Sequence, residues 1–222
     1  MDWRTPLLRI MWRDDADIEP MSERFIERFV TIFLTKIAYF EVNGSGVKLR
    51  RGLFIGRFQP PHLGHLHAIK QALEECDELI IVIGSSQYSH TFENPFTAGE
   101  RFEMIRLMLK DGGVDLSKVI IIPVPDVGEH SLWVSRIESY CPRFDVIYTN
   151  NPLVQRLFKE AGYEVKELKL YRREVEMGTI IRKKIINGDL WEDFVSKSVA
   201  EYLKKSGMVQ RLKEIFGRSD KS

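Results

Sequence analysis

Residues 52–65 read GLFIGRFQPPHLGH, and this stretch decides the fold. Its first part, Gly52 to Gly56, is a short apolar run bounded by glycines, which is typical of a buried strand. An amphipathic segment from Leu63 to Cys76 follows the polar loop, with apolar residues at helical spacing. A strand, a loop and a helix in this order predict the opening of a parallel β-sheet.

The same alternation continues to about residue 170. Further apolar strands are expected at residues 79–84, 119–124, 145–149 and 163–170, with helices starting near Thr97, Ser131 and Pro152. Parallel strands joined by helices need right-handed crossovers, which place helices on both faces of one sheet. We therefore predict an α/β fold with a Rossmann-like, doubly wound, five-stranded parallel sheet.

Beyond Gly178 the sequence predicts helices alone. They are expected at residues 179–187, 191–204 and 208–216. Open parallel sheets bind ligands at the carboxyl ends of their strands, above all where the strand order reverses. We therefore expect the chemistry in the loops that follow strands, and first in the loop after the first strand.

That loop carries the residue types of an anion site. Gly56 and Gly64 allow a close approach of the backbone, and the following helix offers free N–H groups at its positive end. His62, His65 and Arg57 converge on the same place. This combination suits a phosphate chain on which negative charge builds up during a transfer reaction.

The histidine pair has two other interpretations. One is a pair of zinc ligands, but no cysteine or acidic third ligand lies nearby, so no protein-bound metal is expected. The other is a structural cap at the start of the helix. The sequence contains neither of the common glycine-rich phosphate motifs, and the context of strand, glycine-containing loop and helix favours phosphate binding over both alternatives.

The loop resembles the G-x-F-x-P-x-H-x-G-H signature of the nucleotidylyltransferase superfamily. A distant segment, residues 178–182, is similar to the S-x-T-x-x-R signature of the same superfamily. Within it, residues 93–101, 132–134 and 151–156 and Asp126 resemble the archaeal nicotinamide-nucleotide adenylyltransferases. The resemblance covers about residues 51–216.

The resemblance implies direct transfer of the adenylyl group from ATP to nicotinamide mononucleotide (NMN), giving NAD and pyrophosphate without a covalent enzyme intermediate. It implies that His62 and His65 contact the ATP phosphates, with His65 stabilising charge at the α-phosphate. Arg182 would hold the β- and γ-phosphates. Further ATP contacts are implied for Gly56, Arg57, Phe58, Gly64 and Thr179. Mg²⁺ is expected to arrive with ATP.

Five residues are expected on the NMN or nucleotide side: Ser85, Arg101, Asp126, Trp133 and Asn151. Trp133 offers a flat indole face to the cationic nicotinamide ring, against the alternative of a core tryptophan. Asp126 would accept from the carboxamide or offset the charge of the ring, against the alternative of a turn or cap carboxylate. Arg101 is either a phosphate ligand or a surface charge.

Two positions depart from the family pattern. Met177 stands where the late signature has serine, and Asn150 stands where the archaeal proteins typically have glycine. The first change removes one hydroxyl contact to phosphate, and the second alters a backbone approach to the adenosine. Neither touches the histidines or Arg182, so we expect activity to survive both.

Composition limits the remaining classes of function. With 44% hydrophobic and 29% charged residues the chain is not a disordered protein, and a net charge of +1 argues against a dedicated nucleic-acid or membrane binder. Two widely separated cysteines, Cys76 and Cys141, suggest reduced thiols and a cytoplasmic protein. The resemblance implies a homo-oligomer, of which a hexamer is one candidate.

Other activities remain open at this point. A sister adenylyltransferase for FMN or phosphopantetheine would share the histidine signature, although Arg182 and Trp133 weigh against it. A non-catalytic nucleotide-binding regulator should have lost His62, His65 or Arg182, and all three are present. The sequence does not separate nicotinamide from nicotinate mononucleotide as the acceptor.

The first 46 residues lie outside the resemblance. We expect an N-terminal extension at 1–46, mis-assigned as coding sequence or disordered, and a nucleotidylyltransferase domain at 47–222. Gly44-Ser-Gly46 is typical of a flexible break, and Val47 would fit a GUG start codon. The alternative is an amphipathic docking helix from about Ser22 to Phe40, whose apolar residues recur at helical spacing.

Overall fold

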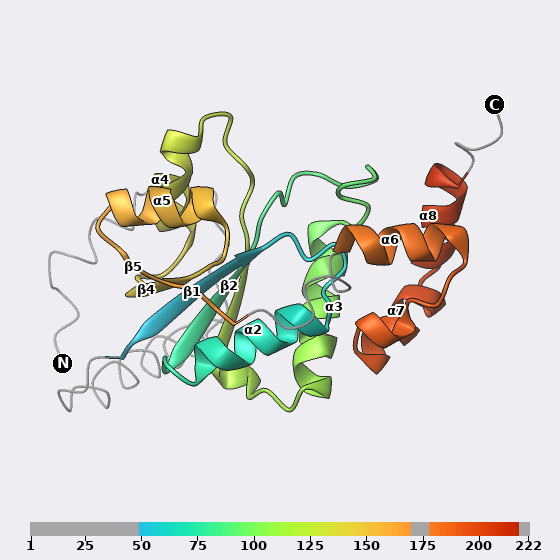
Figure 1. Ribbon diagram of the computed structural model, residues 1–222, viewed down its shortest axis with the longest axis horizontal. Coiled ribbons are helices and arrows are strands. Elements are labelled where there is room, and N and C mark those ends of the chain that lie inside the picture. Colours follow the sequence, from blue (N-terminus) through green and yellow to red (C-terminus); the bar gives the residue numbers. More distant parts are fainter. Residues whose placement is uncertain (1–48, 170–177, 218–222) are drawn as a thin grey trace, which may run out of the picture. The chain divides into compact units, whose positions relative to one another are not determined.

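The computed structural model describes residues 49–169 and 178–217, and the expectations for residues 1–46 and Met177 lie outside these ranges. Its centre is a five-stranded sheet in the order β3-β2-β1-β4-β5 (Figure 1). The strands are β1 (Arg51–Gly56), β2 (Glu78–Ile83), β3 (Val119–Pro123), β4 (Val146–Tyr148) and β5 (Glu164–Lys166). Every neighbouring pair is parallel, which confirms the predicted doubly wound sheet.

Helices connect the strands as the sequence pattern predicts. They are α2 (Leu63–Leu73), α3 (Ala98–Asp111), α4 (Trp133–Tyr140) and α5 (Pro152–Glu160), and short 3-10 turns span Leu116–Lys118 and His130–Leu132. The predicted start of α3 is confirmed in detail. The Thr97 side chain accepts from the N–H of Glu100, whose carboxylate accepts from the N–H of Thr97.

The two faces of the sheet have separate apolar cores. Along β2, Leu79, Ile81 and Ile83 pack with α2 and α3, whereas Ile80 and Val82 pack with α4 and α5. This alternation follows from the two-residue period of a strand, and it explains why the strand is apolar throughout. The chain passes through β2 and β3 on one side of β1 and returns to β4 and β5 on the other. The strand order therefore reverses between β1 and β4.

The C-terminal part is helical but differs from the prediction in one place. It contains α6 (Gly178–Asn187), a 3-10 turn (Glu192–Phe194), α7 (Lys197–Lys205) and α8 (Met208–Phe216). The single helix expected at 191–204 is wrong, because Val195 and Ser196 are extended. The carboxylate of Asp111, at the end of α3, accepts from the N–H and the hydroxyl of Ser198, and this contact favours a fresh start for α7.

One ion pair ties α8 to the beginning of α3. The guanidinium of Arg211 donates two hydrogen bonds to the carboxylate of Glu100, at 2.9 and 2.7 Å, and a third to the carbonyl of Pro95 at 3.2 Å. This bidentate arrangement is the strong form of an arginine–carboxylate contact.

In the described ranges, no helix is long and apolar enough to cross a bilayer.

Candidate active site

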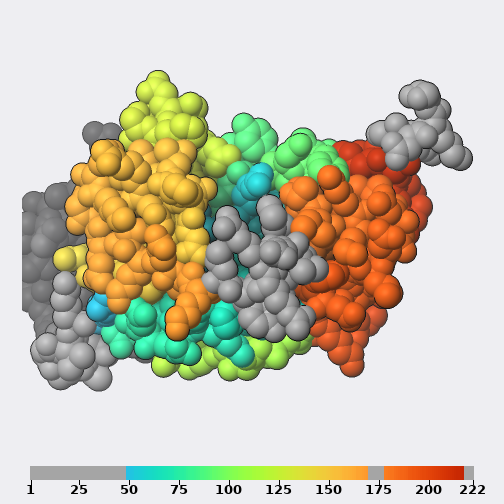
Figure 2. Space-filling view, viewed as in Figure 1, coloured from blue at the N-terminus to red at the C-terminus, as the bar shows by residue number. Residues whose placement is uncertain are grey.

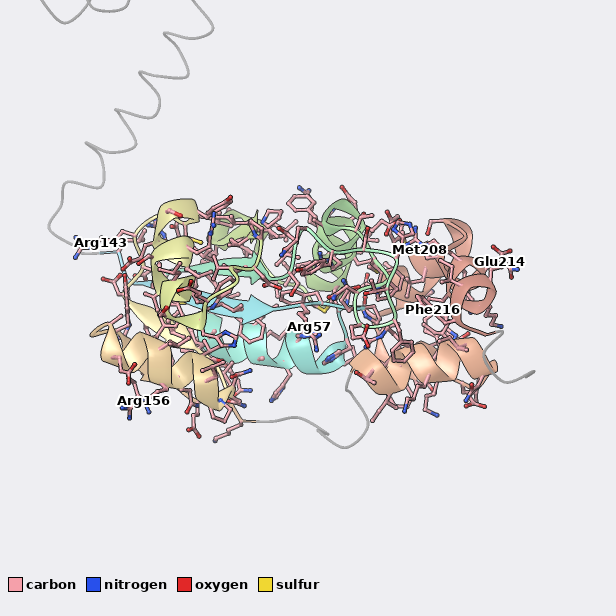
Figure 3. The ribbon with its side chains drawn as sticks, turned by 90° about the horizontal axis from the view of Figure 1, so that it is seen from above. Arg57, Arg143, Arg156, Met208, Glu214 and Phe216 are labelled. Carbon is pink, nitrogen blue, oxygen red and sulfur yellow. The ribbon has the colours of Figure 1, made fainter. Side chains whose placement is uncertain are left out.

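The loop after β1 has a fixed and partly strained shape. Arg57 is exposed just beyond the arrowhead of β1 (Figure 3), whereas Phe58 is buried in a left-handed backbone conformation with φ of 53°. Gln59 anchors the loop, because its side-chain amide both accepts from the N–H of Phe96, at 3.0 Å, and donates to the carbonyl of Phe96, at 3.1 Å. A Cβ atom at Gly56 would stand 2.9 Å from the Phe58 ring, so this position needs glycine.

The two histidines of the signature lie against each other at the start of α2. Their ring centroids are 3.7 Å apart, and the backbone N–H of His62 donates to Nδ1 of His65 at 3.2 Å. Burial lowers the pKa of His62 to about 4, and burial together with His62 holds the pKa of His65 well below its ordinary value. Without a ligand both rings are therefore neutral at pH 7.

The second signature, residues 178–182, contacts this loop through Arg182. Arg182, buried in α6, donates through Nη1 to the carbonyl of Gln59 at 2.6 Å and through Nη2 to the hydroxyl of Thr179 at 3.1 Å. Its guanidinium also lies over the ring of Phe92, 5.2 Å from the centroid. Burial, and then the charge of Arg57, lowers the pKa of Arg182 to about 10. Its Nε has no hydrogen-bond partner among the described residues.

A pocket of about 430 Å³ opens at the point where the strand order reverses. Six residues predicted for the site line it: Gly56, Arg57, Ser85, Asp126, Trp133 and Asn151. In Figure 2 the blue atoms of residues close to β1 lie between the yellow and orange surface of residues 150–169 and the surface of the C-terminal helices. The sequence-based location at the carboxyl edge of the sheet is confirmed, whereas the binding roles of the residues stay predictions.

Trp133 and Asn151 each stabilise the fold and also line the pocket. The indole of Trp133 packs against the apolar core of the α4 and α5 face and also lines the pocket, so neither of its two interpretations excludes the other. The Asn151 side chain accepts from the N–H groups of Leu153 and Val154 and so caps α5, at the pocket wall.

Asp126 and Ser85 form a short bridge across the pocket wall. The carboxylate of Asp126 accepts from the N–H of Ser85 at 3.1 Å, and the N–H of Asp126 donates to the side chain of Gln87 at 2.9 Å. Ser85 has a left-handed backbone with φ of 51°. One carboxylate oxygen of Asp126 is therefore engaged in the turn, as the turn interpretation predicts. The residue as a whole is exposed and lines the pocket.

One of the two expectations for Arg101 needs correction. Its side chain is fully buried, so the interpretation as a surface charge is wrong. Its guanidinium donates to the carbonyls of Thr97, Arg57, Gly84 and Ser85, and the residue does not line the pocket. Its role as a phosphate ligand stays a prediction. Arg101 is a buried link between loops in this structure.

Several site residues carry no signal in the sequence. Gln59, Gln87 and Phe92 act through partners 37 or more positions away, and only the fold brings these partners together. His130 lines the pocket from the 3-10 turn that follows β3, and its position after a parallel strand could have indicated this. The Asn150 side chain pairs with the N–H and carbonyl of Leu168 and so prolongs the contact between β4 and β5.

Comparisons with known proteins agree with this geometry. A family model described as cytidylyltransferase-like matches residues 53–198. A protein of Pyrobaculum arsenaticum named nicotinamide-nucleotide adenylyltransferase is 52% identical over 164 residues, covering 73% of this chain and 92% of its own length. A protein of the same name from Archaeoglobus fulgidus is 52% identical over 172 residues, covering 76% and 98%.

A solved structure gives the same result. The bifunctional NMN adenylyltransferase/ADP ribose pyrophosphatase of Francisella tularensis, complexed with AMP and a manganese ion, matches with a TM-score of 0.64 and 26% identity. The match covers 76% of this chain and about half, 52%, of that one. The present chain therefore belongs to the cytidylyltransferase-like family of nucleotidyltransferases. Within that family it groups with the archaeal nicotinamide-nucleotide adenylyltransferases.

Proposed function

We propose that this protein transfers the adenylyl group of ATP to NMN, releasing NAD and pyrophosphate. The observation that carries the proposal is the position of the pocket. It contains Trp133 and Asp126 and shares Gly56 and Arg57 with the loop that bears His62 and His65. An acceptor in the pocket and a phosphate chain on the loop would lie next to each other, as a direct transfer requires.

The ATP side consists of cations and N–H donors. Arg57 and Arg182 bring two guanidinium groups close enough for the charge of Arg57 to lower the pKa of Arg182, which favours an anion between them. The hydrogen bond that Nδ1 of His65 accepts leaves the ring proton on Nε2, where it can be donated to a phosphate oxygen. We assign Phe58, Gly64 and Thr179 to the shape of this loop and of its contact with α6.

The acceptor side consists of one aromatic face and a few polar groups. The indole of Trp133 would stack on the nicotinamide ring, which carries a positive charge in NMN. Asp126 and Asn151 supply oxygen atoms at the pocket wall, and Ser85 supplies a hydroxyl. Apart from Arg57 and Asp126, the lining is mostly apolar, with Ile55, Val127, Leu153, Val154 and Leu157, which suits a flat heterocycle better than a second polyphosphate.

The nucleotide substrate is MgATP. We propose that the ion enters on the phosphates, since Mg²⁺ prefers phosphate and water oxygens to a dedicated protein cage. The phosphate of NMN would attack the α-phosphorus in line, so that one P–O bond forms as the bond to pyrophosphate breaks. Arg182 would neutralise the leaving pyrophosphate, and His65 would donate to the α-phosphate as its charge grows.

A direct assay tests the proposal. The purified full chain is incubated with ATP, Mg²⁺ and one acceptor at a time: NMN, nicotinate mononucleotide, FMN or phosphopantetheine. Pyrophosphate and the dinucleotide product are measured. We expect NAD and pyrophosphate in equal amounts with NMN, and the nicotinate reaction measures acceptor preference. Turnover with FMN or phosphopantetheine alone would overturn the proposal. Light scattering on the same sample tests our further expectation of a homo-oligomer.

A further inference from the structure

A buried arginine joins the ends of two strands beside the pocket. The Nη1 atom of Arg101 donates to the carbonyl of Arg57 at 3.0 Å and to that of Gly84 at 2.8 Å. Its Nη2 donates to the carbonyl of Ser85 at 3.1 Å, and its Nε donates to the carbonyl of Thr97 at 3.2 Å. The loop after β1, the loop after β2 and the start of α3 are thus held by one side chain.

The acceptor carbonyls flank the left-handed residues of these two loops. Phe58 has φ of 53° and Ser85 has φ of 51°, a conformation that is disfavoured for residues with a side chain. Such a conformation persists where the surrounding contacts enforce it. The carbonyl of Arg57 belongs to the peptide before Phe58, and those of Gly84 and Ser85 belong to the peptides on either side of Ser85.

Both left-handed residues connect directly to the site. The ring of Phe58 packs on His65, with 4.6 Å between the centroids. The N–H of Ser85 donates to Asp126, and both residues line the pocket. A change in either turn would therefore move a group that faces one of the two substrates.

We infer that Arg101 is a positioning residue that fixes the turns after β1 and β2 and so sets the spacing between the histidine loop and the acceptor pocket. For its kinetic readout this inference rests on the proposed function. A guanidinium fits the task because its donors diverge in one plane toward several carbonyls. A lysine ammonium places its three donors at one point and cannot reach both loops in the same way. Arg101 makes no ion pair with a carboxylate of the described residues, so backbone carbonyls are its main partners.

The first test compares Arg101→Met and Arg101→Lys with Arg106→Met, a change at an exposed position of the same helix. Thermal unfolding of each variant is measured beside kcat and both KM values. We expect kcat to fall about 10²-fold in Arg101→Met, the loss typical of a small misplacement of reacting groups, with a raised KM for NMN. Arg106→Met should match the wild type. Normal kinetics in folded Arg101→Met would overturn the inference.

A second variant separates positioning from general support of the fold. Glycine adopts the left-handed conformation without strain, so Ser85→Gly in the Arg101→Met background should recover several-fold of the lost kcat. Ser85→Gly alone measures the loss of the hydroxyl. If Arg101→Met lowers kcat by the same factor in the Ser85→Gly background as in the wild type, relief of the turn does not matter and the inference is wrong.

A structural readout works independently of the enzyme assay. Crystal structures of Arg101→Met, or of Arg101→Lys if the first variant does not fold, report φ at Phe58 and Ser85. We expect at least one of the two residues to leave the left-handed region. Retention of both conformations would overturn the inference. If the wild type makes no NAD, the proposed function fails, while this comparison still decides what Arg101 does.

Discussion

The backbone N–H of His62 donates a hydrogen bond to Nδ1 of His65, at 3.2 Å. An imidazole that accepts at Nδ1 carries its proton on Nε2 when neutral, so the contact selects one tautomer of His65. The first residue of the pair thus orients the second. Both rings are neutral without a ligand, and a bound phosphate chain would favour their charged forms because opposite charges attract.

Loss of the His65 imidazole should affect the rate much more than binding. His65→Ala removes one preorganised donor, which typically costs on the order of 10²- to 10³-fold in kcat. The KM for NMN should stay close to its wild-type value, since Trp133 and Asp126 remain. Steady-state kinetics measure both constants. His67→Gln, a substitution outside the signature on the same helix, is the matched control, and near-normal turnover of His65→Ala would remove the assigned role.

The stability of the ligand-free protein should fall in mild acid because of His62. The unfolded chain takes up a proton near pH 6.5, whereas burial lowers the pKa of His62 in the folded protein to about 4. Folding free energy is therefore lost as the pH drops through this window, on the order of 2 kcal/mol from this residue by pH 4.5. Thermal unfolding at pH 7 and 4.5 should show a smaller drop for His62→Asn than for wild type. Equal drops would contradict the burial argument.

The planar fork of Arg182 should matter for ATP. Arg182→Lys keeps the charge but loses the contacts that Nη1 and Nη2 make at the same time with Gln59 and Thr179. A hydrogen bond to a charged group contributes about 1.5–3 kcal/mol, so kcat/KM for ATP should fall about 10- to 10²-fold. Lys183→Ala, on the exposed side of the same helix, controls for charge. Unchanged ATP kinetics in Arg182→Lys would make Arg182 a structural residue.

Loss of the Trp133 indole should weaken the binding of NMN and leave the binding of ATP nearly unchanged. Cation–π contacts contribute about 0.5–2 kcal/mol, so Trp133→Ala should raise the KM for NMN about 3- to 30-fold. Trp191→Phe is the contrasting control, because Trp191 is buried with α7 and lies away from the pocket. It should lower the melting temperature and leave the KM for NMN unchanged. A Trp133 variant that unfolds or weakens both substrates together favours the core interpretation.

The predicted domain boundary can be tested by truncation. We propose that residues 47–222 contain all that the reaction needs, and that residues 1–46 are an extension. The truncated protein should then equal the full chain in specific activity, melting temperature and oligomeric mass. A lower mass or a clear loss of stability would instead favour the alternative docking helix at about Ser22 to Phe40.

The sheet and the location of the pocket could be predicted because they depend on local patterns. Apolar runs, helical spacing and the Thr97–Glu100 capping box each depend on residues that are close in the sequence. The rules for connections between parallel strands then give the arrangement of the sheet. The break at Val195 and Ser196 escaped prediction because the helical spacing of apolar residues continues through it. The contact that favours a helix start there comes from Asp111, 87 positions from Ser198 in the sequence.

The site was harder to predict where a side chain binds backbone carbonyl groups. Trp133, Asp126 and Arg57 follow strands, and this position alone places them at the pocket. Arg101 follows a helix cap and has the sequence context of an exposed residue. Its burial depends on hydrogen bonds to three backbone carbonyls at the ends of β1 and β2. Because every residue has a backbone carbonyl, the sequence does not show which carbonyls an arginine will bind.

The ion pair between Arg211 and Glu100 has a practical consequence for anyone who modifies the carboxyl terminus. Glu100 stands directly before Arg101, and the same guanidinium of Arg211 holds the carbonyl of Pro95 in the segment that Gln59 clamps through Phe96. Shortening the chain into α8, or fusing a bulky partner against it, would disturb the N-terminal turn of α3. Affinity tags and fluorescent labels for binding studies are therefore better attached after Gly217 through a spacer than within the last helix.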